Sequence, residues 1–256
     1  MSNTWSFTTS NSDYQLICQE AASNDELFNV FKQNKRYQEV LEHVSYQAGQ
    51  ELLDDTKDKE FMLDNLEKFR ANDVLGGANI QDYGTYGSLS PSTARYIKNA
   101  IDIRYEFGPG LTKIVEIGGG YGGLAKTMSV VYKLEKYTVV DIPEVNLLSN
   151  KYISNFPELD GIFNTHSCYE YPTITDLDLV ISNYALSELN IDGQLEYFDK
   201  IIQHAQHFYI IYNFIIPNAN ENYNIIKDKL SQIFDIREES EREPWASGRI
   251  MYGDRR

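Results

Sequence analysis

The stretch that decides the fold is Lys113-Ile-Val-Glu-Ile-Gly-Gly-Gly-Tyr-Gly-Gly123, in which a strand-like segment runs directly into glycines. KIVEI is a short apolar run typical of a buried strand, and a helical pattern follows over residues 124–134. Glycine lets the backbone turn sharply and lets a ligand approach closely. The helix N-terminus behind it carries partial positive charge. The stretch therefore predicts a strand, a ligand-binding turn and a helix.

Strand and helix patterns alternate along the rest of the chain. Further strands are expected at residues 137–141, 161–166, 177–183, 207–215, 233–239 and 249–253, and helices at 145–155, 192–206 and 219–231. This alternation implies a mostly parallel sheet with right-handed crossover connections. We therefore predict an α/β fold of the Rossmann-like class, with a mostly parallel seven-stranded sheet, over residues 106–256.

Residues 1–105 follow a different pattern. No proline precedes Pro91, and apolar residues recur at helical spacing between Leu27 and Phe69. Residues 76–90 are polar and rich in glycine, which predicts a loop. Ser90 and Pro91 then predict the N-cap and first position of a helix. We expect an N-terminal helical extension over residues 1–105, which either caps the ligand side of the sheet or forms the surface of a homodimer.

The composition limits the class of protein. The chain has 256 residues, 42% of them apolar, and a net charge of −15. Such acidity disfavours nucleic acid as a partner, because phosphate binding needs clustered Lys and Arg. No run approaches the ~18–20 apolar residues of a membrane span, and the first ten residues lack the pattern of a signal peptide. With Cys18 and Cys168 as the only cysteines, we expect a cytoplasmic protein without a disulfide framework.

Two carboxylates accompany the glycines. Gly118, Gly120 and Gly123 match the G-x-G-x-x-G fingerprint of dinucleotide-binding proteins. Glu116 precedes them, and Asp141 ends the second expected strand, where a carboxylate can accept both hydroxyls of a ribose. That position suits NAD and S-adenosylmethionine alike. The motif therefore predicts an adenosine cofactor without choosing between these two.

The fourth expected strand distinguishes between these two cofactors. Residues 177–183, LDLVISN, run into Tyr-Ala-Leu-Ser-Glu-Leu at 184–189. This stretch resembles motif IV of class I methyltransferases, and the spacing Glu116-x-Gly118-x-Gly120 resembles their motif I. The resemblance implies S-adenosylmethionine as the cofactor, with the acidic residue before the glycines organising its methionine end. Motif IV commonly carries two histidines, and here Ser187 and Glu188 stand in their places.

The chain as a whole resembles the bacterial sugar O-methyltransferases associated with surface-polysaccharide synthesis. The stretches that carry the resemblance are Asn34 to Gly49, Gly87 to Tyr96, Val115 to Gly123, Tyr137 to Glu144 and Ile181 to Leu189. It implies O-methyl transfer to a hydroxyl of a sugar or sugar nucleotide in capsule or lipopolysaccharide synthesis. Three alternatives stay open: a small phosphorylated or acidic acceptor, a nicotinamide-dependent oxidoreductase, and a non-catalytic module that binds the cofactor.

Methyl transfer to an alcohol needs alignment of the reacting atoms and a general base. Glu188 is the first candidate for the base, and His166 is the second catalytic candidate. No compact cluster of carboxylates and histidines demands a metal ion. Two tyrosines lie in the glycine-rich segment 76–90, which is expected to act as a lid. The remaining candidates are Glu116, Gly118, Gly120, Asp141, Arg95, Tyr86 and Asn183 for the cofactor, with Arg95 on its carboxylate, and Tyr184, Ser187 and Tyr83 for the acceptor.

Overall fold

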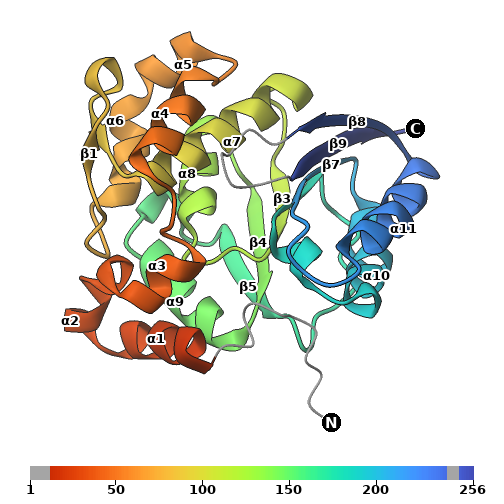
Figure 1. Cartoon of the computed structure of the whole chain (residues 1–256), viewed down its shortest axis with the longest axis horizontal. Helices are drawn as coiled ribbons and strands as arrows, with labels where there is room; N and C mark the ends of the chain where they lie inside the picture. The colour runs from red at the N-terminus through yellow and green to blue at the C-terminus, as the bar shows by residue number, and fades with distance from the viewer. Residues whose placement is uncertain (1–11, 241–247) are drawn as a thin grey trace.

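A seven-stranded sheet forms the centre of the computed structural model, which describes residues 12–240 and 248–256 (Figure 1). Its strands are β3 (Lys113–Ile117), β4 (Lys136–Asp141), β5 (Phe163–Ser167), β6 (Leu179–Asn183), β7 (His207–Tyr212), β8 (Phe234–Ser240) and β9 (Arg249–Arg255). They are ordered β5-β4-β3-β6-β7-β9-β8. Strand β9 runs antiparallel to both of its neighbours, and the other pairs are parallel. The predicted Rossmann-like, mostly parallel sheet is confirmed.

The strand order reverses beside β3. The chain builds β3, β4 and β5 outward to one side and then returns to place β6 and β7 on the other. In open α/β sheets, ligands bind at such a switch point, outside the carboxyl ends of the strands. The glycine turn follows β3 and residues 184–189 follow β6, so both predicted motifs meet at this point.

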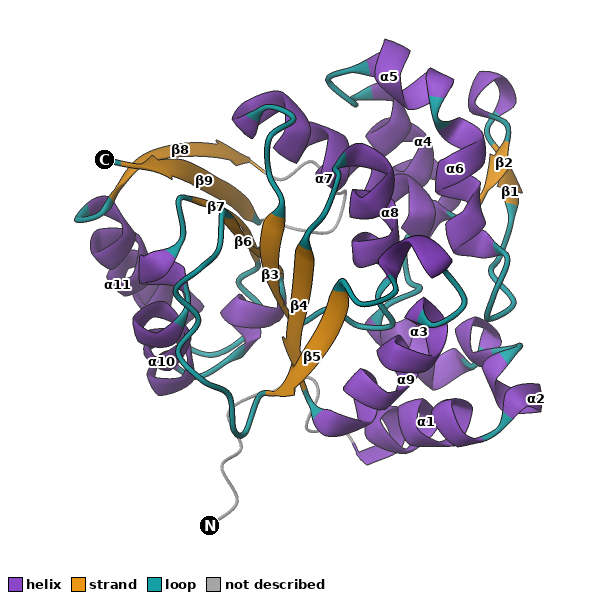
Figure 2. Ribbon diagram, turned by 180° about the vertical axis from the view of Figure 1, so that it is seen from behind, coloured by secondary structure: helices purple, strands orange, loops and turns teal. Residues whose placement is uncertain are grey.

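Helices cover both faces of the sheet (Figure 2). Helices α7 (Pro91–Phe107), α8 (Gly123–Val131) and α9 (Pro143–Ile153) pack on one face, and α10 (Ile191–Lys200) and α11 (Ala219–Ser231) on the other. Successive side chains of a strand point to opposite faces of the sheet, so alternate residues pack against the two helical layers. In β6, for example, Leu179 and Ile181 join the cluster with α7 and α8, whereas Val180 joins the cluster with α10 and α11.

The N-terminal residues add a helical layer outside α7, α8 and α9 (Figure 1). Its helices are α1 (Ser12–Ser23), α2 (Asp25–Phe28), α3 (Lys35–Val40), α4 (Tyr46–Asp54), α5 (Lys59–Asp64) and α6 (Leu66–Arg70). Helix α1 packs on α9, and α4 packs on α7. The expected start of α7 is confirmed, because the Ser90 hydroxyl accepts a hydrogen bond from the Thr93 amide at 3.1 Å. The division of the chain at residue 105 stays a prediction.

Short elements complete the fold. Single 3-10 turns lie at η1 (Phe31–Gln33), η2 (Ala71–Asp73), η3 (Gly84–Tyr86), η4 (Pro157–Leu159), η5 (Ala185–Glu188) and η6 (Ile202–His204). The glycine-rich segment, expected to be a loop, contains an antiparallel pair, β1 (Gln81–Asp82) and β2 (Ser88–Leu89). Strands of two residues are too short to produce a periodic sequence signal. Among the described residues, no helix has the length and apolar character needed to cross a membrane.

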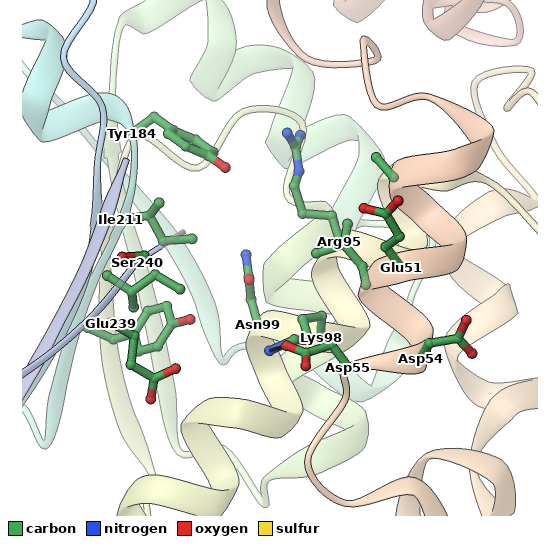
Figure 3. A pocket seen from close by; sticks show the side chains of 14 residues that line it. Glu51, Asp54, Asp55, Arg95, Lys98, Asn99, Tyr184, Ile211, Glu239 and Ser240 are labelled. Carbon is green, nitrogen blue, oxygen red and sulfur yellow. Dashed lines mark ion pairs between the residues drawn. The ribbon is translucent and has the colours of Figure 1, made fainter. Parts of the chain in front are cut away.

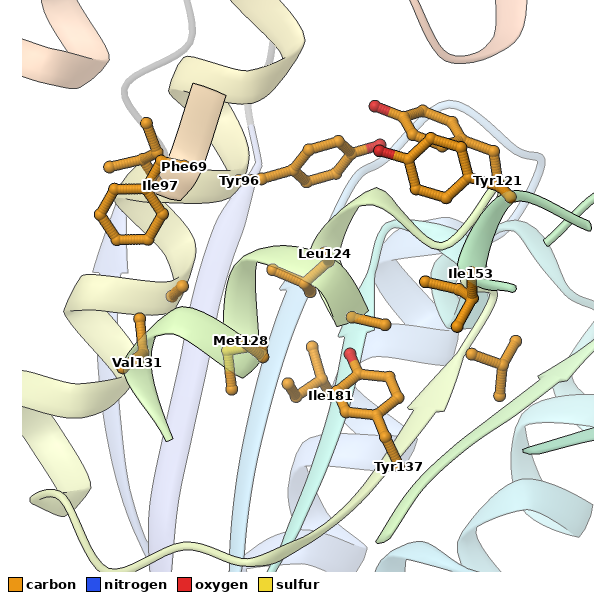
Figure 4. Packing of buried hydrophobic residues seen from close by; sticks show 14 of the residues in the cluster. Phe69, Tyr96, Ile97, Tyr121, Leu124, Met128, Val131, Tyr137, Ile153 and Ile181 are labelled. Atoms are coloured by element: carbon orange, nitrogen blue, oxygen red, sulfur yellow. The ribbon is translucent and has the colours of Figure 1, made fainter. Parts of the chain in front are cut away.

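A buried polar network joins the N-terminal layer to the glycine turn. Asn72 is fully buried, and its amide donates to the hydroxyl of Tyr121, a residue of the turn, at 3.3 Å. The Tyr152 hydroxyl donates to the Asn72 side chain at 2.6 Å. The Lys32 ammonium donates to the Asn72 carbonyl at 3.0 Å and lies 4.3 Å from the Tyr121 ring centroid. Figure 4 shows Tyr121 packed above Leu124 of α8. Polar and apolar contacts together therefore hold the turn in place.

Replacing Asn72 with alanine is expected to lower the free energy of unfolding by about 1–3 kcal/mol, because buried hydroxyls lose their partner. Urea denaturation of the full chain measures this change. The exposed residue Asn224 of α11 provides the control, since its replacement by alanine should change stability by less than about 0.5 kcal/mol. Equal effects of the two substitutions would contradict the structural role of the network.

Candidate functional site

The turn after β3 requires glycine at its first position. Gly118 has a φ of 78°, in the left-handed region. A Cβ placed there would lie 2.1 Å from the Cβ of Ala185, which follows β6. At Gly120, where φ is 52°, a Cβ would lie 2.8 Å from Leu41 Cδ1 of the N-terminal layer. The turn is thus flanked by the end of β6 and by Leu41.

Three amides of this turn are engaged within the chain. The Gly118 amide donates to a β4 carbonyl at 3.0 Å, and the Gly122 amide donates to the Gly119 carbonyl at 3.0 Å. The Gly120 amide donates to Asp141 Oδ2 at 3.1 Å. In a dinucleotide site, such amides face a pyrophosphate. Here the turn instead presents a carboxylate, and burial raises the pKa of Asp141 to about 6.

A second carboxyl group lies behind the turn. Glu116 is 2% exposed, and its Oε2 accepts a hydrogen bond from the Tyr137 hydroxyl at 2.7 Å. Burial raises the pKa of Glu116 to about 8, so the group is mostly protonated at neutral pH. At the end of β6, Asn183 Oδ1 is buried without a hydrogen-bond partner among the described residues. Three acceptor groups therefore gather at the carboxyl ends of β3, β4 and β6, an arrangement suited to a ligand with donors and positive charge.

The turn after β6 is fixed by a residue that the sequence analysis missed. Asn213 follows β7, and its side chain donates to Glu188 Oε1 at 3.1 Å. Its amide donates to the Ser187 hydroxyl at 3.1 Å, and that hydroxyl donates to the Tyr184 carbonyl at 2.6 Å. Ser187 is fully buried, so it shapes the turn. A polar residue directly after an apolar strand, as in HFYIIYN, is the signal that could have identified Asn213.

Tyr184 has an unusual backbone. Its φ is 70°, which is costly for an aromatic residue. Such backbone strain clusters at ligand-binding and catalytic sites. The Tyr184 ring centroid lies 5.9 Å from the guanidinium carbon of Arg95. Arg95 in turn donates to the Leu41 carbonyl at 3.1 Å. Tyr184 and Arg95 therefore lie next to the glycine turn, as predicted for residues of one site.

Three other candidates lie farther from Tyr184 and Glu188. His166 is on β5, so β4 and β3 separate it from β6 and Glu188. The Tyr86 hydroxyl donates to Asp54 Oδ1 at 2.9 Å in the N-terminal layer. Tyr83 stacks on Tyr46, with ring centroids 4.9 Å apart. Both tyrosines are buried. The structure thus brings Glu116, the glycines, Asp141, Asn183 and Tyr184 together and places Tyr83 and Tyr86 outside this group. His166 lies beside Val140 of β4, one residue before the partner of Asp141, so it is closer to Asp141 than to Glu188.

A cavity of about 360 Å³ adjoins the end of β6. Figure 3 shows its walls, with α4 and α7 on one side and the sheet on the other. Arg95 and Tyr184 line it, as do Lys98 and Asn99 of α7. The sequence analysis did not single out Asn99, since polar residues on a helix ordinarily face solvent. The cavity places a second binding region beside the glycine turn.

The sequence matches no known family and none of the curated proteins. Solved structures are similar to the chain. Magnesium protoporphyrin IX methyltransferase from Synechocystis PCC 6803, with S-adenosylmethionine bound, is 14% identical over 63% of this chain and 79% of that one, with a TM-score of 0.48. TrmK from M. capricolum, with S-adenosylhomocysteine, is 16% identical over 63% and 67%, at 0.45. The methyltransferase domain of bacterial CtHen1-C is 12% identical over 62% and 96%, at 0.47.

Proposed function

We propose that the protein is an S-adenosylmethionine-dependent methyltransferase. The observation that supports this most strongly is the pair of carboxyl groups at the turn, with Asp141 bound to the Gly120 amide and Glu116 buried behind it. The Asp141 carboxylate on the Gly120 amide would compete with a pyrophosphate for that donor and repel its charge. S-adenosylmethionine instead brings an ammonium group, a sulfonium and two ribose hydroxyls. Carboxylates and amide oxygens are the partners that such groups require.

Each cofactor group has a partner of suitable chemistry. Asp141, at the end of β4, would accept the ribose hydroxyls. Glu116 and Asn183 would accept from the ammonium group, and Arg95 would bind the carboxylate. The unpartnered Asn183 Oδ1 fits a donor from the ligand. When bound, S-adenosylmethionine supplies a methyl group on a positively charged sulfur. The protein's part is to orient this group toward the acceptor and to exclude water.

The acceptor in this proposal is a hydroxyl of a sugar or sugar nucleotide used in surface-polysaccharide synthesis. The cavity beside Tyr184 is the space available for it. Glu188 is the candidate base, and it follows Tyr184 in the chain without lining this cavity. Asn213 holds one oxygen of the Glu188 carboxylate, which would orient the group to take the hydroxyl proton. A small phosphorylated or acidic metabolite is the second candidate. It would need cations at the cavity, of which Arg95 is the nearest to the turn.

Replacing Asp141 with asparagine is expected to weaken the binding of S-adenosylhomocysteine by about 10–100-fold, because charged hydrogen bonds to the ribose are lost. Asparagine keeps an acceptor for the Gly120 amide, so the turn should persist. Titration calorimetry measures the Kd, and thermal unfolding checks the fold. The matched control is the exposed Asp160→Asn, which should leave the Kd unchanged. An unchanged Kd in Asp141→Asn would remove Asp141 from the site.

A further inference from the structure

Helix α7 buries a polar stripe against the sheet. Four charged or amide side chains recur at positions i, i+3, i+4 and i+7, on one face of the helix. They are Arg95, Lys98, Asn99 and Asp102, with exposed fractions of 5%, 8%, 4% and 4%. Lys98 and Asp102 form an ion pair, which leaves Asn99 between them and Arg95. Buried polar groups are costly unless they are hydrogen-bonded, so this stripe requires partners.

Asn99 has a donor without a partner. Its Nδ2 is buried and makes no hydrogen bond to any residue of the described ranges 12–240 and 248–256. In Figure 3, the side chain of Asn99 points into the space between α7 and Ile211 of β7. Asn99 lines the cavity together with Tyr184. A buried amide aimed into a cavity indicates a ligand oxygen that accepts its hydrogen bond.

The charges around the cavity indicate the kind of ligand. Its lining includes the carboxylates of Glu51, Asp55 and Glu239 and the cations Arg95 and Lys98, whereas the Asp54 carboxylate binds the Tyr86 hydroxyl. Lys98 is already engaged by Asp102 and lies 3.6 Å from Asp55. A phosphate would enter an excess of negative charge. Carboxylates and amides suit hydroxyl and ammonium donors instead. At about 360 Å³, the cavity is at the small end for ligand sites.

We propose that this cavity is the acceptor site, and that it takes a compact polyol without phosphate, either neutral or bearing an amine. Asn99 donates to an oxygen of this ligand, and Glu51 of α4 accepts from its hydroxyl or ammonium groups. The inference rests on the proposed function, because Tyr184 joins the cavity to the glycine turn. It narrows that function by excluding sugar nucleotides and phosphorylated metabolites as acceptors.

The test uses the full chain saturated with S-adenosylhomocysteine and a panel of hexoses and hexosamines, each paired with its 6-phosphate. Ligand-observed NMR competition gives the Kd values. The best unphosphorylated sugar is expected to bind at least tenfold more tightly than its own phosphate. In the variant Glu51→Gln, this preference should fall at least threefold. Phosphates that bind equally well or better, or a panel without any bound sugar, would overturn the assignment.

Asn99→Leu separates recognition from packing. Leucine has a similar size and removes the unpartnered donor, so the ligand-free variant should unfold at the same temperature or a higher one. Its affinity for the best sugar should fall at least tenfold, while its Kd for S-adenosylhomocysteine stays within twofold. Asn224→Leu, on the exposed face of α11, is the control. Retained sugar binding in Asn99→Leu contradicts the inference. Failure of S-adenosylhomocysteine binding in the wild type contradicts the proposed function instead.

Discussion

Replacing Gly118 with valine is expected to abolish cofactor binding and to destabilise the fold. The φ of 78° at Gly118 costs a β-branched residue about 1–3 kcal/mol. Its Cβ would also lie 2.1 Å from the Cβ of Ala185, and relief of that overlap adds about 1–3 kcal/mol. Because Ala185 directly follows Tyr184, any shift of Ala185 would move Tyr184 as well as the glycine turn. Urea denaturation and titration with S-adenosylhomocysteine measure the two effects.

Gly110 is the matched control. It is exposed, its φ is not in the left-handed region, and a Cβ there would meet no atom within 4 Å. Gly110→Val should therefore leave both stability and cofactor binding close to those of the wild type. A Gly118→Val protein that binds S-adenosylhomocysteine with the wild-type Kd would show that the turn is not the cofactor site.

The affinity for S-adenosylhomocysteine is expected to rise with pH up to about pH 8. In the free protein, burial raises the pKa of Glu116 to about 8, so the group holds a proton at neutral pH. Binding an ammonium group beside it requires the carboxylate, and the proton is released. Below pH 8 the Kd should therefore fall by up to about tenfold for each pH unit gained. Calorimetry between pH 6.5 and 8.5 measures the Kd. This range lies above the pKa of Asp141, near 6, so Asp141 is mostly ionised throughout.

Glu116→Gln tests the origin of this dependence. Glutamine cannot ionise, so the Kd of this variant for S-adenosylhomocysteine should be higher than that of the wild type at pH 8. It should not change with pH between 6.5 and 8.5. The free proteins give an independent check. The pKa of Glu116 is raised from 4.5 to about 8 in the folded protein, so the folded state holds this proton more tightly than the unfolded state. The free energy of unfolding of the wild type therefore falls by up to about 1.4 kcal/mol for each pH unit gained in this range. The stability of the variant relative to the wild type should therefore increase from pH 6 to 8. A wild-type Kd that does not change with pH would contradict the role of Glu116.

The parts of the fold that local sequence determines could be predicted. The apolar runs before Gly118 and Tyr184 are strands, and the Ser90-Pro91 pair begins a helix, because hydrophobic period and capping act over a few residues. The meeting of the glycine turn with the end of β6 followed from the topology of parallel sheets. These features define the part of the site around Glu116 and Asp141.

The cavity could not be predicted in this way. The polar residues of α7 have the spacing of an ordinary amphipathic helix, for which the expected surroundings are solvent. They are buried because α4 covers them from outside, a contact between segments about 45 residues apart that leaves no local signal. The contact of Asn213 with Glu188 likewise depends on β7 lying beside β6. Burial set by distant segments therefore determined which polar residues reach the site.

The central claim is that the glycine turn binds S-adenosylmethionine and not a dinucleotide. Calorimetric titration of the wild-type protein with S-adenosylhomocysteine and, separately, with NADH tests this claim most directly. We predict a micromolar Kd for S-adenosylhomocysteine and no heat of binding for NADH, because Asp141 engages the Gly120 amide and carboxyl groups flank the turn. Binding of NADH without binding of S-adenosylhomocysteine would contradict the account and assign Gly118, Gly120 and Gly123 to a pyrophosphate.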